Sequence, residues 1–291
     1  MKSNHPVAIV TDSSISLPHD LIENHQVFVA PVQLILNDIT YQDGVDIWPS
    51  EFYQLLRTSS AAPTTAGVSP LSFQNAFIGA NKVASTIICI TMAKELSSTY
   101  QAAIMAVKQT KNILKETPIH IVDSRTAGIA QGLIVLETAE AIKNGTSVEH
   151  IRQIVANTSS KVKFIGFLNT LEYLRRSGRV SASQWFFASL IRTKPILELS
   201  SGIVLPVGRP RTTKHAIRSM IERMKRQLGD SKCRIAIAHA DNFSDASDLY
   251  QAIDSNLNHE NMFITDFTPV IGAHTGPGLV GCAFFKYLQS T

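Results

Sequence analysis

Val7-Ala8-Ile9-Val10-Thr11 runs directly into Asp12-Ser13-Ser14, and this stretch near the start of the chain decides the fold. Its apolar residues occupy odd and even positions alike, and most of them are β-branched. Such a run is typical of a strand that is covered on both faces. Similar runs occur at residues 28–36, 86–92 and 119–122, and we predict that each forms one strand.

Helical patterns separate these strands. They occupy residues 17–24, 49–57, 71–81, 97–110 and 131–143, with Ser69-Pro70 ahead of the third and Asn144-Gly145 behind the last. Proline beside a helix start and glycine after its end are typical boundary signals. Alternating strands and helices indicate a mostly parallel α/β sheet with flanking helices and right-handed crossovers.

The pattern changes after about residue 160. Strands are expected at 162–168, 195–199, 203–207, 234–240, 262–267 and 280–285, and helices at 171–176, 181–191, 214–228 and 244–253. Ser200-Ser201-Gly202 marks a hairpin between two of the strands. We therefore predict two domains, an N-terminal α/β domain at residues 1–158 and a smaller C-terminal α+β domain at 159–291, with a ligand between them.

Composition excludes several classes of protein. Of the 291 residues, 44% are hydrophobic and 17% are charged, which indicates packed cores rather than a disordered chain. No apolar run is long enough to span a membrane, and no signal peptide is visible, so we expect a cytoplasmic protein without stable membrane insertion. The net charge of +4 is not concentrated in a basic stripe, so we expect no nucleic-acid partner. Cys89, Cys233 and Cys282 are isolated and are expected to be buried thiols.

Four polar clusters follow predicted strands or precede predicted helices, and they lie at residues 11–14, 63–67, 97–99 and 123–126. Each could be a helix cap or a turn, which Ser, Thr and Asp commonly form. Because ligands bind at the carboxyl ends of parallel strands, the four together could instead line a donor-rich cup for an anion.

Ile271-Gly272-Ala273-His274-Thr275-Gly276-Pro277-Gly278 is the most distinctive string of the chain. It lacks the lysine of a phosphate-binding P-loop and the spacing of a dinucleotide motif. We interpret it as a glycine-rich loop that presents His274 to a ligand.

A basic segment follows residue 170. Arg175, Arg176 and Arg179, with Arg192, Lys194, Arg209, Arg211 and Lys214, make the second half locally basic. These residues form either a solvated surface or a patch that faces an anion or a partner. Asp12, Asp43, Asp46 and Asp123 are not spaced as metal ligands, so no metal site is expected.

Several strings together resemble the DegV family of bacterial fatty-acid-binding proteins. They are residues 9–14, 41–44 with 52–53, 63–65 with 69–70, 96–101, 122–124, 171–174 with 178–179, 194–197 and 272–278. Each string alone is short, but together they cover nearly the whole chain in the family's order.

The resemblance implies two α/β domains that hold a long-chain fatty acid between or beneath them. It implies that Thr65 and Ser97 hydrogen-bond the carboxylate, with His274 close by. Arg179 would line the same cleft or face a kinase, and Ser13, Ser98 and Gly272 are weaker candidates for the cleft or a docking face. The expected partner is the catalytic subunit of a fatty acid kinase, which phosphorylates the bound acid. The protein itself would be a carrier rather than an enzyme, with no cofactor other than the fatty acid ligand.

The chain departs from the family's pattern at Ala66, Gly67, Ser98, Ala93 and Lys94. These positions bear on the geometry of the head group and on lipid preference. Two apolar segments, residues 164–168 and 185–191, could line a tunnel for the acyl chain. Two other functions remain open: a serine-dependent acyl hydrolase that uses Ser97 and His274, and a regulator that binds another small carboxylate or phosphate.

Overall fold

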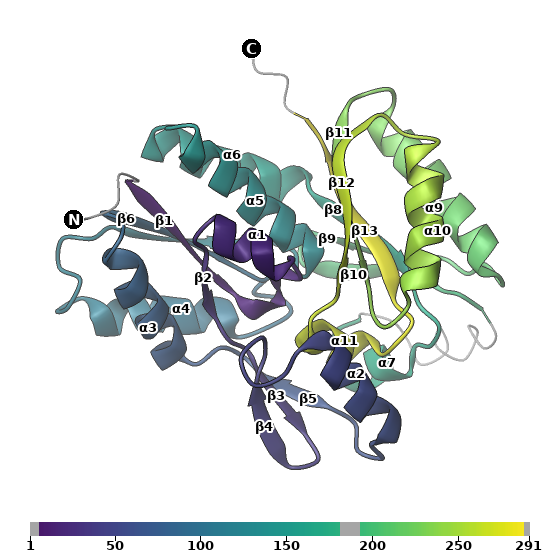
Figure 1. The fold of residues 1–291 in the computed structure, drawn as a ribbon, viewed down its shortest axis with the longest axis horizontal. Helices are drawn as coiled ribbons and strands as arrows, with labels where there is room; N and C mark the ends of the chain where they lie inside the picture. The colour runs from purple at the N-terminus through teal and green to yellow at the C-terminus, as the bar shows by residue number, and fades with distance from the viewer. Residues whose placement is uncertain (1–5, 181–192, 288–291) are drawn as a thin grey trace.

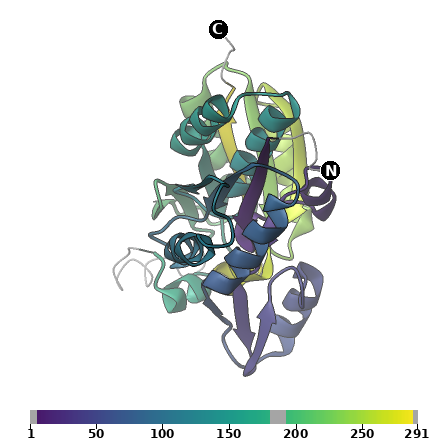
Figure 2. The same ribbon diagram turned by 90° about the vertical axis from the view of Figure 1, so that its left-hand side faces the viewer.

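The computed structural model describes residues 6–180 and 193–287. Two large sheets lie next to each other with helices between them, and a third, small sheet forms a lobe below (Figures 1 and 2). This arrangement confirms the predicted fold class, a parallel α/β portion followed by a sheet-rich C-terminal portion.

The N-terminal sheet is parallel throughout, in the order β2-β1-β6-β7. Its strands are β1 (Val7–Asp12), β2 (Phe28–Ala30), β6 (Thr86–Thr91) and β7 (Ile119–Asp123). Alternate residues of β1 pack in different clusters: Val10 joins α3 (Pro70–Asn81) and α4 (Thr99–Thr110), whereas Ile9 joins α5 (Ile129–Lys143). The apolar run is therefore covered on both faces, as its composition predicts. The 3-10 turn η1 (Ser13–Ile15) and helix α1 (His19–Asn24) follow β1.

The small sheet contains β3 (Gln33–Leu36) between β4 (Ile39–Gln42) and β5 (Thr64–Ala66), and helix α2 (Pro49–Thr58) lies in the same lobe (Figure 1). The prediction of one strand at residues 28–36 is wrong. Pro31 lacks the N–H that a continuing ladder needs, so the run divides into β2 and β3, which belong to different sheets.

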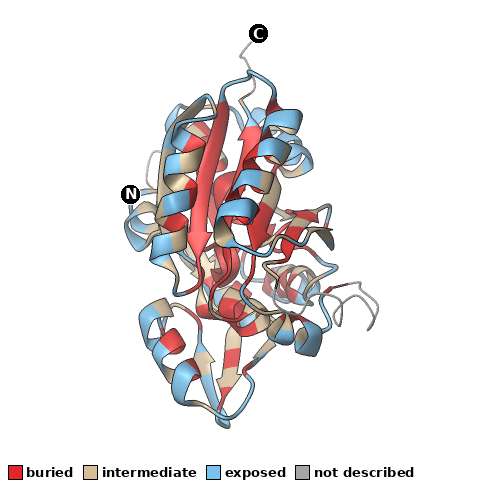
Figure 3. Cartoon of the chain, turned by 90° about the vertical axis from the view of Figure 1, so that its right-hand side faces the viewer, coloured by how far each residue is buried: buried red, intermediate tan, exposed pale blue. Residues whose placement is uncertain are grey.

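The C-terminal sheet is mixed, in the order β10-β9-β8-β13-β11-β12. Its strands are β8 (Lys163–Phe167), β9 (Ile196–Ser200), β10 (Ile203–Gly208), β11 (Cys233–His239), β12 (His259–Asp266) and β13 (Val280–Lys286). The predicted hairpin is confirmed: β9 and β10 pair antiparallel, and Ser201 and Gly202 between them have φ of 53° and 78°, which suits the turn of a two-residue hairpin. Helices α9 (Thr213–Leu228) and α10 (Phe243–Asp254) pack on the outer face, where Figure 3 shows their exposed sides.

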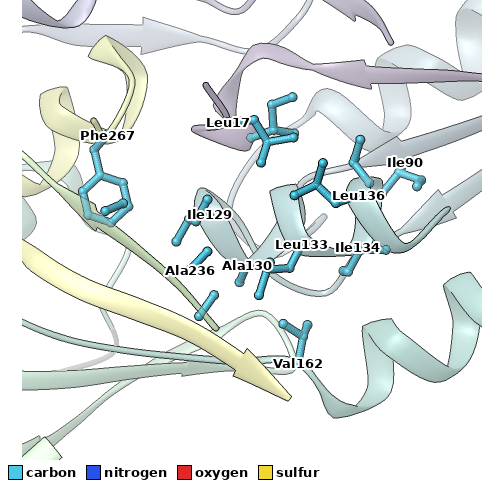
Figure 4. Packing of buried hydrophobic residues seen from close by; sticks show 14 of the residues in the cluster. Leu17, Ile90, Ile129, Ala130, Leu133, Ile134, Leu136, Val162, Ala236 and Phe267 are labelled. Atoms are coloured by element: carbon cyan, nitrogen blue, oxygen red, sulfur yellow. The ribbon is translucent and has the colours of Figure 1, made fainter. Parts of the chain in front are cut away.

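Helix α5 lies between the two large sheets. It contacts β1 and β6 on one side and β8, β11 and β13 on the other. Figure 4 shows Ile129, Leu133 and Ile134 of this helix near Ile90 of β6 and Ala236 of β11. A helix that is apolar on all sides belongs in a core, so one core cluster includes residues from both predicted domains. The division at residue 158 falls inside α6 (Val148–Lys161), and it stays a prediction.

The helices predicted at residues 49–57, 71–81, 97–110, 131–143, 171–176, 214–228 and 244–253 are confirmed, with ends shifted by a few residues. The fifth of them corresponds to α7 (Glu172–Ser177). Helices α6 and α11 (Pro269–Thr275) were not predicted. The helix expected at 181–191 lies outside the described residues. Cys89, Cys233 and Cys282 are free and buried, as expected. Within the described ranges, no helix has the length and hydropathy needed to cross a membrane.

Candidate functional site

A cavity of about 430 Å³ lies at the carboxyl ends of the parallel strands. Val32, Met92 and Ala127 follow β2, β6 and β7 and line it from the N-terminal sheet. The opposite wall comes from the C-terminal sheet, with Phe164, Leu197, Leu199 and Val204. Edges of this kind are where open α/β sheets bind ligands.

Five of the polar residues that the sequence singles out line this cavity: Thr65, Ser97, Ser98, Arg179 and His274. They come from β5, the loop before α4, the residues after α7, and α11. Segments far apart in the sequence thus meet at one polar end of a mostly apolar space.

Thr65 and His274 contact each other directly. The Thr65 Oγ1 lies 2.7 Å from His274 Nε2, across strand β5 and helix α11. Burial, with a smaller effect from the positive charge of Arg179, lowers the pKa of His274 to about 4. The ring is therefore neutral at pH 7, with one nitrogen that donates and one that accepts a hydrogen bond.

The start of α4 supplies two further hydroxyls. Ser97 Oγ lies 2.9 Å from Thr99 Oγ1 and accepts a hydrogen bond from Thr99 N at 3.3 Å. Ser98 lies over Gly67, where a Cβ would come within 2.5 Å of Ser98 Oγ. Gly67 and Ser98, two positions where the chain departs from the family's pattern, therefore lie against each other in the cavity wall.

Arg179 is exposed and lines the cavity, and its side chain donates to the carbonyl of Ser177 at 2.6 Å. No Asp or Glu occurs among the described residues that line the cavity. The polar end therefore combines a guanidinium, a neutral imidazole and several hydroxyls, which suits a single anionic group.

The model of the DegV protein family matches residues 6–287 of this chain. The chain belongs to the DegV family. A DegV domain-containing protein from Caldanaerobacter subterraneus is 32% identical over 279 residues, which are 96% of this chain and 98% of that protein.

Solved structures of two other DegV proteins share the fold. The one from Thermus thermophilus, described by its fatty acid binding, has a TM-score of 0.90 at 28% identity, over 97% of this chain and 100% of its own. DegV from Bacillus subtilis, described as a fatty acid binding protein, has a TM-score of 0.85 at 26% identity, over 98% of this chain and 100% of its own.

Two of the weaker candidate residues of this DegV protein, Ser13 and Gly272, do not line the cavity. Ser13 Oγ donates to Asp43 Oδ2 at 2.6 Å and accepts from Val32 N at 3.1 Å. Gly272 packs against α2, where a Cβ would lie 2.5 Å from Tyr53 Oη. Both residues therefore have structural contacts that a single sequence does not reveal.

Two of the four polar clusters also lie elsewhere. Asp12 is buried and accepts hydrogen bonds from Ser14, Met92 N and Gln131. These bonds connect the end of β1 to the residue that follows β6 and to helix α5. Ser124 donates to the Thr126 carbonyl at 3.1 Å, as in an ordinary turn. The clusters at 63–67 and 97–99 are the pair that reaches the cavity.

The interpretation of residues 271–278 as a loop is wrong for its first half. His274 lies in the last turn of α11, which has Pro269 at its first turn and ends at Gly276 with φ of 73°. Thr268-Pro269 before the string was the available signal for this helix.

Sequence reasoning missed most of the apolar wall. Of the residues 164–168, Phe164 and Leu168 line the cavity, and residues 185–191 lie outside the described chain. Leu197 and Leu199 were expected only as a strand, although their spacing of two places both on one face. Phe267 ends a predicted strand and Ile271 begins the glycine-rich string, but no sequence signal marked either residue as part of a cavity wall.

The geometry does not favour a serine hydrolase. His274 Nε2 faces Thr65, and Ser97 Oγ pairs with Thr99, so the described side chains do not join Ser97 to His274. A serine nucleophile needs a base within hydrogen-bonding reach. Within the described residues, no group of three His, Cys, Asp or Glu side chains could hold a metal ion.

Proposed function

We propose that this protein binds one long-chain fatty acid in the cavity between its two large sheets. The acyl chain lies along Phe164, Leu197 and Leu199, and the carboxylate lies at the polar end. The observation that carries this proposal is the lining itself, which is mostly apolar, holds one guanidinium and has no carboxylate among its described residues. The fatty acid binding described for the Thermus thermophilus and Bacillus subtilis relatives supports it.

The energetics fit such a ligand. Each buried methylene contributes roughly 0.8 kcal/mol, so a sixteen-carbon tail contributes on the order of 10 kcal/mol before the costs of association. A carboxylate inside the protein needs hydrogen-bond donors, because an unpaired buried charge is strongly unfavourable. Thr65, Ser97 and neutral His274 supply them, and Arg179 adds a positive charge.

The proposal is tested with palmitate. Native mass spectrometry of the purified protein should show a bound species of fatty-acid mass. The double variant Thr65→Val with Ser97→Ala should bind palmitate at least about tenfold more weakly, because two hydrogen bonds to a charged group are lost. Ser160→Ala on α6 removes a hydroxyl that bonds only Asn157 and serves as the matched control. Unchanged palmitate affinity in the double variant would contradict the head-group assignment.

We also propose that the bound carboxylate is presented to a fatty acid kinase. A carboxylate oxygen attacks the γ-phosphorus of ATP on the kinase, the bond to the bridging oxygen breaks, and ADP leaves with an acyl phosphate as product. Exposed Arg175 and Arg209, with Arg179 at the cavity, would dock an acidic face of that partner.

Acyl phosphate formation with a bacterial fatty acid kinase subunit, ATP and Mg²⁺ tests this step. Arg175→Glu with Arg209→Glu should lower the rate about tenfold through charge repulsion, while palmitate affinity stays the same. Arg218→Glu on α9 is the matched control, since it lies on an exposed outer helix surface. If no acyl phosphate forms with any such kinase, the carrier role is contradicted, whereas the proposal of lipid binding is unaffected.

A further inference from the structure

A second cavity of about 520 Å³ lies beside α1, the start of α2 and the junction of β12 with α11. It is a different space from the fatty acid cavity. The chain at residues 265–271 separates the two: Thr265, Asp266 and Thr268 line the second cavity, whereas Phe267 and Ile271 line the first.

The second cavity has an incompletely bonded carboxyl group in its wall. Asp43 is 2% exposed, and its Oδ2 accepts a hydrogen bond from Ser13 Oγ at 2.6 Å. Its Oδ1 is buried and has no hydrogen-bond partner among the described residues. The same holds for Thr268 Oγ1, also in the lining. Buried polar atoms are nearly always paired, so these two atoms of one wall could accept hydrogen bonds from a polar ligand group.

The ionisable groups that line this cavity are carboxyl groups, whereas the first cavity holds the guanidinium of Arg179. Glu23, Asp43 and Asp266 line it, and its described lining includes neither Lys nor Arg. His19 pairs with Glu23 at 3.1 Å. A space with carboxylates and no fixed positive charge favours a cation over an anion.

Much of the remaining lining is apolar. Ile22, Val27 and Phe28 form part of it, and Trp48, which is 43% exposed, also lines the cavity. An indole face attracts a positively charged ligand group as well as apolar surface. The cavity therefore suits a molecule with one cationic end and an apolar body.

Burial raises the pKa of Asp43 to about 8, with a smaller contribution from the nearby charge of Asp12. Without a neighbouring cation this group is therefore largely protonated at pH 7. An ammonium at hydrogen-bonding distance would stabilise the ionised form, as any adjacent cation does.

We propose that this second cavity binds a protonated amine carried on an apolar body, with the ammonium group at Asp43 and Thr268 and the body against Trp48. The proposal does not depend on the fatty acid site. It rests on the two orphaned polar atoms, the acidic lining and the apolar wall of a cavity that lies apart from Thr65 and His274.

The test uses 2-phenylethylamine as the probe and full-length protein loaded with palmitate, so that the first cavity is occupied. Calorimetric titration is compared with 2-phenylethanol and phenylacetate, which have similar bodies but a neutral or anionic end. The amine should bind at least about tenfold more tightly than the alcohol, and phenylacetate should not bind.

Three variants locate the binding. Asp43→Asn and Asp266→Asn should each weaken the amine severalfold, and Asp266 is exposed, so its variant keeps the test valid if the buried variant does not fold. Asp38→Asn, in the β3–β4 turn at φ of 61°, is the matched control and should have no effect. Equal binding of amine and alcohol, no binding of the amine, or unchanged affinity in both variants would overturn the proposal. Palmitate retention in each variant reports separately on the first site.

Discussion

His274 shows how burial sets the chemistry of a single residue. Its lowered pKa keeps the imidazole neutral throughout the physiological range, so it acts as a hydrogen-bond donor or acceptor rather than as a charge. The adjacent Arg179 then carries the positive charge of the polar end. In the proposed complex, a neutral donor beside an exposed cation would bind the carboxylate without burying a fixed ion pair, which is energetically costly.

This pKa has a measurable consequence for stability. The folded His274 has a pKa of about 4, while the unfolded chain has about 6.5, so the unfolded state binds more protons between these values. The free energy of unfolding therefore rises with pH from about 4 to 6.5. His274→Gln lacks this dependence. In urea melts of lipid-free protein, the stability of wild type relative to the variant should be greater at pH 7 than at pH 5. The same difference at both pH values would contradict the buried neutral ring.

The contribution of Asp43 to the pH dependence of stability has the opposite sign. Its folded pKa of about 8 exceeds the unfolded value of 3.8, so the folded state binds more protons and loses stability as pH rises through this interval. Asp43→Asn removes the titration while it keeps an acceptor for Ser13. The melting temperature of the variant relative to wild type should therefore increase from pH 5 to pH 8. Asp38→Asn, an exposed carboxylate, should show no such trend.

The residues of the polar end were largely predictable, and their partners were not. Thr65, Ser97 and His274 stand out as hydroxyls and a histidine in ordered motifs, and the structure brings all three to one cavity. Ser13 looks the same in the sequence, yet it pairs with Asp43, thirty positions away. Such pairings depend on tertiary packing, which a local pattern does not encode.

At the scale of elements, the spacing of apolar residues and the residues at helix ends predicted most helices and strands. Two of the errors have a common origin in single residues that override a pattern. Pro31 divides an apolar run that otherwise reads as one strand, and glycines around His274 conceal a helix that Pro269 begins. The spatial neighbours of these elements, such as the hairpin β9–β10 across the cavity from β6, follow from topology rather than from sequence spacing.

Helix α11 gives a prediction at this scale. A Cβ on Gly272 would lie 2.5 Å from Tyr53 Oη and 2.8 Å from Phe52 Cε1, so Gly272→Ala should push α11 away from α2. Overpacking of this kind costs about 1–3 kcal/mol, and the shift of His274 should also weaken palmitate binding. Gly79→Ala in α3, whose Cβ would meet only the Phe28 ring at 3.2 Å, is the matched control. Denaturant melts and palmitate titrations of both variants measure the two effects, and equal, small effects would contradict the close packing.

At the scale of the molecule, the two large sheets share helix α5 and therefore depend on each other. The cavity proposed to bind a fatty acid lies between them, so its width depends on how firmly they are joined. Arg234 of β11 is a principal link. It is 6% exposed and pairs with Glu137 and Glu140 of α5, with 2.7 Å from its Nη1 to Glu140 Oε2.

Removal of Arg234 alone should cost more stability than removal of Arg234 together with its partner Glu137. Arg234→Met should destabilise the protein by about 3 kcal/mol at pH 7, because a half-buried Glu137 loses the cation that offsets its burial. Burial already raises the pKa of Glu137, and without Arg234 that pKa should rise further. Protonation of Glu137 is more favourable at pH 5 than at pH 7, so part of the loss should be recovered at pH 5. Adding Glu137→Leu to the Arg234→Met variant should restore most of the stability at pH 7, since the uncompensated charge is gone. Urea melts at both pH values decide the matter: a loss of equal size in the single and double variants would show that Arg234 acts through its packing rather than through its charge.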